Sequence, residues 1–338
     1  MVPEDKAPEQ IIKIPIDPPP KTSSSSPSSF LTSERKYSSF YYFLSWLTLW
    51  WRGILDSIGN IISFFTCRLF NHHRWASLPE DLSGQTVVIT GANGGLGKET
   101  ARVAARKGAK VIFACRNEET TAQAMEEISR EEGCKRENLV FVRLDLSSLA
   151  SVRAAAAEIT ELTDQIDVLV NNGGVMMCPK WTTVDGHEYQ MGTNYLGHFL
   201  FTLLLLNRVK KSPSGGRIVN VASIAYMMGR PWFKDPNLDG KGVYNPLRSY
   251  SRSKLYQMLS MAYMAKRLEE SGSRVKLYGL HPGVVDTGIV KHFNCFLRAL
   301  VGVFHRMVMT SPVIGAQTTL HCAFSDEAGR EQTGGYYE

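Results

Sequence analysis

The sequence predicts an α/β protein built on one doubly wound, mostly parallel sheet. Two observations carry this prediction. Short apolar runs alternate with helical stretches from residue 85 onward, and a glycine-rich turn joins the first run to the first helix. A hydrophobic content of 43% with 21% charged residues is that of a folded globular chain. We expect a single domain over residues 84–338.

Six apolar or β-branched runs are expected to be the strands, because such runs favour a buried extended chain. They are residues 85–90, 110–114, 139–143, 167–170, 217–221 and 275–280. The expected helices are residues 96–107, 118–132, 149–162, 198–210 and 250–270. Ligands of such sheets bind beyond the carboxyl ends of the strands, so the residues after each strand are the first candidates for a site.

The N-terminal segment differs from the rest of the chain. Residues 1–39 are rich in proline and contain four consecutive serines, so a disordered tail is expected. Residues 40–75 are apolar and aromatic, which predicts a membrane-associated segment. Its uninterrupted apolar stretch, residues 40–51, is shorter than the roughly 20 residues that span a bilayer. A spanning helix, an interfacial helix and a helix docked on the domain all stay open.

Charge and cysteine content exclude other classes. The formal net charge is +6, but the basic residues are spread along the chain, so no nucleic-acid partner is expected. The six cysteines contain no C-x-x-C pair, and we expect neither a metal site nor a disulfide framework. A reducing compartment is the simplest interpretation.

A glycine cluster directly follows the first predicted strand. A tight turn needs Gly91, close approach of a pyrophosphate needs Gly95, and close packing of helix on strand needs Gly97. The N-terminus of the following helix favours phosphate groups. We therefore expect nucleotide contacts from Gly91, Asn93, Gly94, Gly95, Leu96 and Gly97.

The second predicted strand ends at Ala114-Cys115-Arg116, where no acidic residue stands to accept a ribose 2′-OH. Arg116 is suited to a 2′-phosphate, because its guanidinium makes charge-assisted hydrogen bonds to phosphate. The alternative is an ordinary surface arginine. We expect NADP(H) in preference to NAD(H).

Tyr250 and Lys254 lie four residues apart in a predicted helix, hence on one face. A free phenol has a pKa near 10, and lowering it by about three units needs roughly 4 kcal/mol. One cation at about 4 Å in an effective dielectric near 20 supplies that order of energy. Such pairs also occur by chance, but Ser223, Asn171 and His281-Pro282-Gly283 follow other predicted strands and add polar or glycine-rich groups at the same edge.

These motifs resemble, in their order, those of the short-chain dehydrogenases/reductases, a family with a Rossmann-type fold. They are Thr90-Gly91-x-x-x-Gly95-x-Gly97, Asn171-Asn172-Gly173-Gly174, Ser223, Tyr250-x-x-x-Lys254 and Pro282-Gly283. Residues 114–116, 175–179, 194–199 and 315–318 are similar to the retinol dehydrogenase group of that family. Members of this group are membrane-bound, often microsomal, and mostly NADP(H)-dependent. Gly173 departs from the family, which usually has alanine there.

The resemblance implies four catalytic side chains. Tyr250 would be the general acid/base, and Ser223 would orient the carbonyl or alcohol. Lys254 would lower the pKa of Tyr250 and hold the nicotinamide ribose. Asn194 would position a water that passes the proton outward.

It also implies further cofactor contacts. Asp145 would contact the adenine, Asn171 the adenosine ribose region, and Thr287 the nicotinamide carboxamide. The remaining expected contacts are Leu146, Gly173, Pro282, Gly283 and Val285, with Tyr250 and Lys254.

The function expected from these features is hydride transfer between NADP(H) and a lipophilic aldehyde, ketone or alcohol resembling retinal or retinol. Sterol or polyprenoid carbonyls are an alternative substrate class. A non-catalytic NADP-binding membrane scaffold is the alternative of another kind, and the complete set of four catalytic residues counts against it. The resemblance also implies a membrane location, that of the endoplasmic reticulum, and it allows a homo-oligomer.

Residues 293–309 carry apolar side chains at helical spacing. They are expected either to pack on the core or to form an amphipathic lid that dips into a membrane. Relatives continue beyond the final predicted strand at residues 334–338, so a truncated C-terminus is expected.

Overall fold

The structure is a computed structural model that describes residues 75–231, 233–283, 285 and 310–338, all within the compact unit Ser45–Glu338. The predicted tail, the predicted anchor up to residue 74, Thr287 and the predicted lid at 293–309 lie outside the described residues. Within the described ranges, no helix has the length and apolar character needed to cross a membrane.

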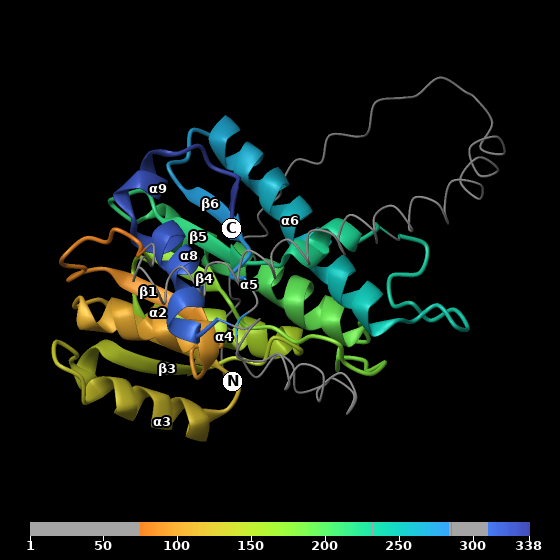
Figure 1. Ribbon diagram of the computed structural model, residues 1–338, viewed down its shortest axis with the longest axis horizontal. Coiled ribbons are helices and arrows are strands. Elements are labelled where there is room, and N and C mark those ends of the chain that lie inside the picture. Colours follow the sequence, from red (N-terminus) through yellow and green to blue (C-terminus); the bar gives the residue numbers. More distant parts are fainter. Residues whose placement is uncertain (1–74, 232, 284, 286–309) are drawn as a thin grey trace, which may run out of the picture. The chain divides into compact units, whose positions relative to one another are not determined.

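Seven parallel strands form one sheet in the order β3-β2-β1-β4-β5-β6-β7 (Figure 1). The strands are β1 (Thr86–Thr90), β2 (Lys110–Cys115), β3 (Leu139–Arg143), β4 (Val168–Asn171), β5 (Arg217–Val221), β6 (Lys276–Leu280) and β7 (Gly335–Tyr337). All six strands predicted from the apolar runs are present. The predicted doubly wound parallel sheet is therefore confirmed, and the chain reverses direction of winding between β1 and β4.

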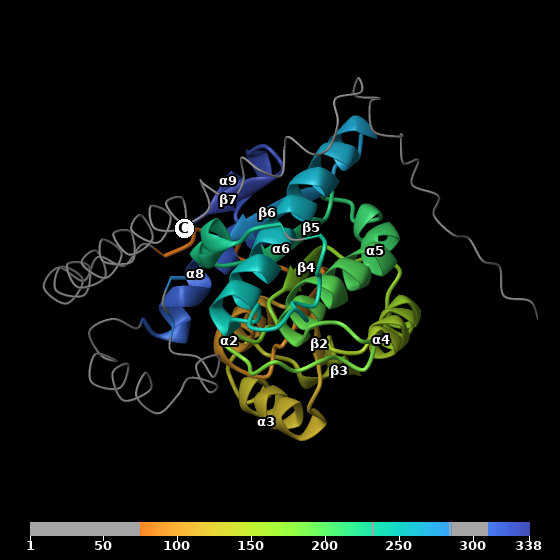
Figure 2. The same cartoon turned by 90° about the vertical axis from the view of Figure 1, so that its right-hand side faces the viewer.

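Helices cover both faces of the sheet, because its central strands are apolar on both sides. One face packs on α2 (Gly95–Arg106), α3 (Glu118–Ser129) and α8 (Pro312–Phe324). The other packs on α4 (Leu149–Leu162), α5 (Gly197–Lys210) and α6 (Pro246–Glu270), as Figure 2 shows. Alternate residues of β1 serve the two cores: Val87 and Ile89 face the first, and Val88 faces the second. Each such fully buried side chain contributes about 1.5–3 kcal/mol.

Shorter elements complete the described chain. They are α9 (Asp326–Arg330), the 3-10 helices η1 (Arg136–Asn138) and η3 (Ile224–Met228), and the π-helix η2 (Met191–Leu196) that leads into α5.

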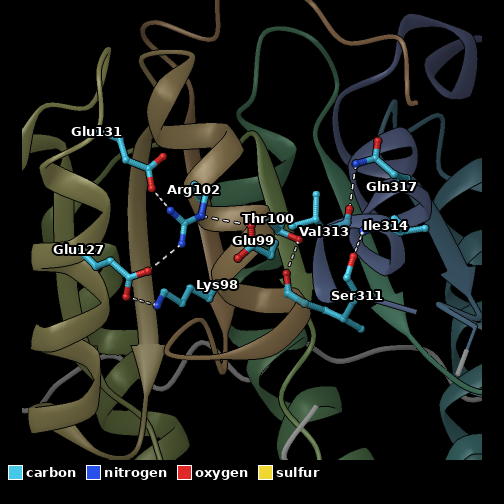
Figure 3. A network of polar contacts seen from close by, with 11 residues as sticks. Lys98, Glu99, Thr100, Arg102, Glu127, Glu131, Ser311, Val313, Ile314 and Gln317 are labelled. Carbon is cyan, nitrogen blue, oxygen red and sulfur yellow. Dashed lines mark hydrogen bonds and ion pairs between the residues drawn. The ribbon is translucent and has the colours of Figure 1, made fainter. Parts of the chain in front are cut away.

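A charge network joins α2 to α3 and the residues that follow it (Figure 3). Arg102 pairs with Glu99 at 3.1 Å, with Glu127 at 3.1 Å and with Glu131, and Lys98 also pairs with Glu127. The Arg102 side chain is only 18% exposed, so this network is better shielded than an isolated surface pair. It holds α3 against the helix that begins at the predicted nucleotide site.

Helix α6 begins four residues earlier than predicted. Asn245 caps it by accepting a hydrogen bond from the Arg248 N–H, and Pro246 occupies the first turn. Tyr250 therefore lies in the second turn of the helix and does not open it. Helix α3 ends at Ser129, three residues before its predicted end.

Candidate active site at the carboxyl edge of the sheet

The glycine turn lies between β1 and α2, as predicted. Gly91 has φ +65° and Gly95 has φ +53°, a left-handed backbone that favours glycine. A Cβ on Gly97 would lie 2.6 Å from the Gly91 carbonyl oxygen and 3.1 Å from the Ala92 Cα, so only glycine fits there. A Cβ on Gly94 would meet nothing within 4 Å, which leaves the start of α2 open to a ligand.

Asn172 fixes this turn, a role that the sequence did not single out. Its side-chain amide donates to the carbonyl oxygens of Thr90 at 2.9 Å and Gly91 at 3.2 Å. The backbone N–H groups of Asn172 and Gly173 both donate to the Thr90 hydroxyl, each at 2.9 Å. The turn after β4 thus holds the turn after β1 in place. A signal was available, because Asn172 directly follows a buried strand.

Arg116 and Asn93 lie on the open side of the turn. Arg116 follows β2, is exposed, and donates to the Tyr189 hydroxyl at 3.2 Å. Asn93 donates to the Thr120 hydroxyl at 2.8 Å, next to the capped start of α3. This exposed guanidinium, hydrogen-bonded to a neutral hydroxyl, is accessible to an anion.

Asp145 and Leu146 follow β3. The Asp145 carboxylate accepts hydrogen bonds from the backbone and hydroxyl of Ser147, at 2.9 and 2.6 Å, which fixes the local turn. Leu146 is 9% exposed, and its terminal carbon would lie 3.0 Å from a Cβ on Gly173. Leu146 therefore lines the floor beneath the turn after β4.

The side chain of Asn171 is buried in the sheet. Both hydrogens of its amide are used, at 2.9 Å to the Thr202 hydroxyl and at 2.9 Å to the Asn220 side-chain oxygen. No amide hydrogen is left for the predicted ribose contact. The reason is strand alternation, which turns Asn171 toward α5 and presents Asn172 at the turn.

Asn194 lies in the π-helix η2 and is fully buried. Its side chain accepts from the Val175 N–H at 2.9 Å and donates to the Val175 carbonyl at 2.9 Å and to the Ser253 hydroxyl at 3.0 Å. These bonds tie η2 to the segment after β4 and to α6. The Asn194 side chain is therefore a positioning group. Its main-chain carbonyl oxygen can still accept a hydrogen bond.

The His198 ring hydrogen-bonds to the Asn194 carbonyl oxygen and to Thr90 at the glycine turn. Its Nδ1 lies 3.0 Å from the Asn194 carbonyl oxygen, which can only accept, so Nδ1 carries the proton. Burial lowers the pKa of His198 to about 4, and the ring is neutral at pH 7. Its Nε2 therefore accepts from the Thr90 hydroxyl at 2.9 Å. His198 was missed as a site residue, because its partner Thr90 lies 108 residues away.

Ser223, Tyr250 and Lys254 meet beyond the end of β5. The Ser223 side chain caps η3 and makes a hydrogen bond with Tyr250. Lys254 Nζ lies 5.9 Å from the centre of the Tyr250 ring and donates to the Val221 carbonyl at 2.8 Å. The predicted juxtaposition of these three side chains is present, and Tyr250 and Lys254 are each only 4% exposed.

The predicted lowering of the Tyr250 pKa is wrong for this structure. Burial raises the pKa of Tyr250 to about 12, and the hydrogen bond from Ser223 only partly opposes this. Lys254 is itself affected, because burial lowers its pKa to about 8. The estimate from one cation at about 4 Å omitted the cost of removing the phenolate from water.

Pro282 and Gly283 follow β6 at the same edge, and Gly283 has φ +76°. Val285 is 7% exposed and packs against Gly315 of α8. Its side chain serves the core, so only its backbone is left for the predicted cofactor contact. Thr287 lies outside the described residues.

Comparison with known proteins agrees with this geometry. Residues 85–235 match the short chain dehydrogenase family. The chain is 43% identical to retinol dehydrogenase 11 of Homo sapiens over 72% of this chain and 74% of that protein. It is 39% identical to human retinol dehydrogenase 13 over 76% and 77%. A short chain dehydrogenase from Shigella flexneri, solved in complex with NADP, superimposes with a TM-score of 0.58 at 22% identity, covering 77% of this chain and 98% of that one.

The chain therefore belongs to the short-chain dehydrogenase/reductase family and is an oxidoreductase. Within that family it falls in the retinol dehydrogenase group.

Proposed function

We propose that this enzyme uses NADP(H) to interconvert a lipophilic aldehyde or ketone and its alcohol, of the retinal/retinol kind, with Tyr250 as the proton donor or acceptor. The observation that carries the proposal is the group formed by Ser223, Tyr250 and Lys254 beyond β5, at the edge that also carries the glycine turn. The names of the similar human proteins support a retinoid substrate.

Tyr250 is suited to donate a proton. With a pKa of about 12 it is protonated at neutral pH, so it can protonate the oxygen of a carbonyl substrate. The Ser223 hydroxyl favours the phenolate that remains, and the Lys254 ammonium adds a positive charge near the ring. When bound, the nicotinamide supplies the hydride in reduction and accepts it in oxidation. These groups favour carbonyl reduction at neutral pH.

The residues around the glycine turn fit a dinucleotide. The surface above Gly94 is open, the N–H groups at the start of α2 face it, and Arg116 adds an exposed cation after β2. Lys254 would hold the nicotinamide ribose, and Arg116 a 2′-phosphate. The Shigella flexneri structure with NADP supports a nicotinamide cofactor in this fold.

Large apolar side chains exposed on segments that follow strands of the sheet support an apolar substrate. Met227 is 43% exposed in η3, Phe233 is 77% exposed in the loop before α6, and Trp181 is 43% exposed in the segment after β4. We propose that residues 40–75 attach the enzyme to a membrane, that of the endoplasmic reticulum, where such substrates dissolve. Exposed Leu259 and Tyr263 on α6 support a homo-oligomer.

A substrate panel on the detergent-solubilised full chain tests the proposal. All-trans retinal and a sterol ketone are offered with NADPH or NADH, and turnover of Tyr250→Phe is compared with that of the wild type. Loss of the phenol proton should lower kcat by about 10²–10⁴-fold. Tyr263→Phe, on the same helix but 56% exposed, is the matched control. Unchanged turnover in Tyr250→Phe would exclude Tyr250 as the proton donor.

A further inference from the structure

A small, partly open cavity lies behind the catalytic groups, between η2, α5, α6 and strands β5 and β6. The side chains of its lining that carry polar atoms are Tyr195, His198, Thr202, Asn220, Gln257 and Ser260. The space that it offers to water has a volume of about 20 Å³. A buried water needs at least about 10–15 Å³ on this measure and two to four polar partners. The cavity thus has the size and the lining for one water molecule.

Gln257 offers such a water an unused donor. Its side chain is 3% exposed, and among the described residues its amide nitrogen has no hydrogen-bond partner. Leaving a buried polar atom unpaired destabilises the fold, so a bound water that pairs with this nitrogen is favoured. The Asn171 side-chain oxygen is also unpaired within the described chain, and the Asn171 amide bonds to Thr202 and Asn220 of the lining.

The other end of the Gln257 amide contacts a catalytic residue. Its side-chain oxygen accepts a hydrogen bond from Lys254 Nζ at 3.3 Å, one turn earlier on α6. The second acceptor of this ammonium is the Val221 carbonyl of β5. Gln257 therefore connects the cavity to the cation beside Tyr250.

We propose that this cavity binds one ordered water, which accepts a hydrogen bond from the Gln257 amide nitrogen and makes its other hydrogen bonds to the cavity lining. The water holds the Gln257 side chain in place. Gln257 in turn positions the ammonium of Lys254 and stabilises its charged form. The proposal rests on the proposed function for its catalytic consequence. The water site itself does not depend on that function.

Lys254 is the group in this cluster that changes charge between pH 6 and pH 10. The titratable groups facing it are Tyr250 on its own helix, with a pKa near 12, and His198 on α5, with a pKa near 4. Strand β5 contributes the uncharged Val221 carbonyl. A basic limb near pH 8 in kcat/KM for retinal reduction with NADPH then reports Lys254.

Two substitutions should move this limb in opposite directions. Gln257→Leu removes an acceptor from the ammonium and should shift the limb down by about one pH unit. Gln257→Glu places a carboxylate beside it and should shift the limb up by about one unit or more. Gln123→Leu, an exposed change on α3, should leave the limb in place. A merely structural role for Gln257 would not give opposite shifts, so shifts of the same sign, or none, would overturn the proposal.

A crystal structure of the detergent-solubilised full chain tests the water directly. Density for one water within hydrogen-bond distance of the Gln257 amide nitrogen is the expected result. A cavity without density, or one filled by an apolar molecule, would overturn the inference. Activity retained in Tyr250→Phe would instead contradict the proposed function and leave the outcome for the water unaffected.

Discussion

His198 should make the folded enzyme sensitive to acid. The imidazole is 2% exposed, and burial lowers its pKa from 6.5 to about 4. As the pH falls, the unfolded chain therefore binds this proton before the folded chain does. The free energy of unfolding should decrease as the pH falls from about 6.5 to about 4, with no further loss from this group below that range.

The size of the effect follows from the shift. Between pH 6.5 and pH 5 the difference is about 1.5 pH units, and at 1.36 kcal/mol per unit the free energy of unfolding should fall by about 2 kcal/mol. Urea unfolding followed by tryptophan fluorescence at pH 7 and pH 5 measures this loss.

His198→Gln isolates the contribution of this side chain. The variant should be less stable at pH 7 by about 1–3 kcal/mol, because the bonds to Asn194 and Thr90 are weakened or lost. Its loss of stability between pH 7 and pH 5 should be smaller than that of the wild type by about 2 kcal/mol. His187→Gln, a half-buried histidine elsewhere, is the control. If His198→Gln loses as much stability in acid as the wild type, the buried neutral imidazole is not the cause.

Two further substitutions test the nucleotide turn. Gly97→Ala should weaken NADPH binding and lower the free energy of unfolding by more than 1 kcal/mol, because its Cβ would lie 2.6 Å from the Gly91 carbonyl oxygen. Gly94→Ala should fold normally, since its Cβ would meet nothing within 4 Å. Equal stability of the two variants in thermal unfolding would contradict this. Arg116→Ser should raise the KM for NADPH about tenfold, since one charge-assisted phosphate contact is worth about 1.4 kcal/mol. The KM for NADH should change little. Equal changes for both cofactors would argue against a 2′-phosphate contact.

The local signals in the sequence were sufficient for the sheet and for the glycine turn. Strands buried on both faces are short apolar runs, and the positive φ angles at Gly91 and Gly95 occur where glycines were expected. The start of α6 was also readable, because Asn245-Pro246 is a helix cap followed by a first-turn proline. The predicted start of this helix at residue 250 followed the Tyr250–Lys254 spacing and overlooked this cap.

The parts of the site that sequence reasoning missed depend on contacts between distant segments. The neutral state of His198 comes from burial and from partners on β1 and η2, which no local pattern encodes. The raised pKa of Tyr250 has the same origin, since its cause is burial, and the depth of burial is a property of the packed chain. The i, i+4 spacing predicts that the two side chains lie on one face of the helix. It does not predict how much burial disfavours the charged phenolate of Tyr250.

The wider ring of the π-helix η2 has a consequence for insertions and deletions. Each residue of an α-helix rotates the chain by about 100°, and each residue of the wider π-helix rotates it by less. Deleting Tyr195 or Leu196 would therefore rotate Asn194 relative to His198, so that the two side chains could not both face their present partners. A substitution in this segment alters one side chain. Such a deletion would break several hydrogen bonds at once, namely those of Asn194 with Val175 and Ser253 and that of His198 with Thr90. Apart from Asn194 itself, the enzyme should therefore tolerate changes of composition in η2 far better than changes of its length.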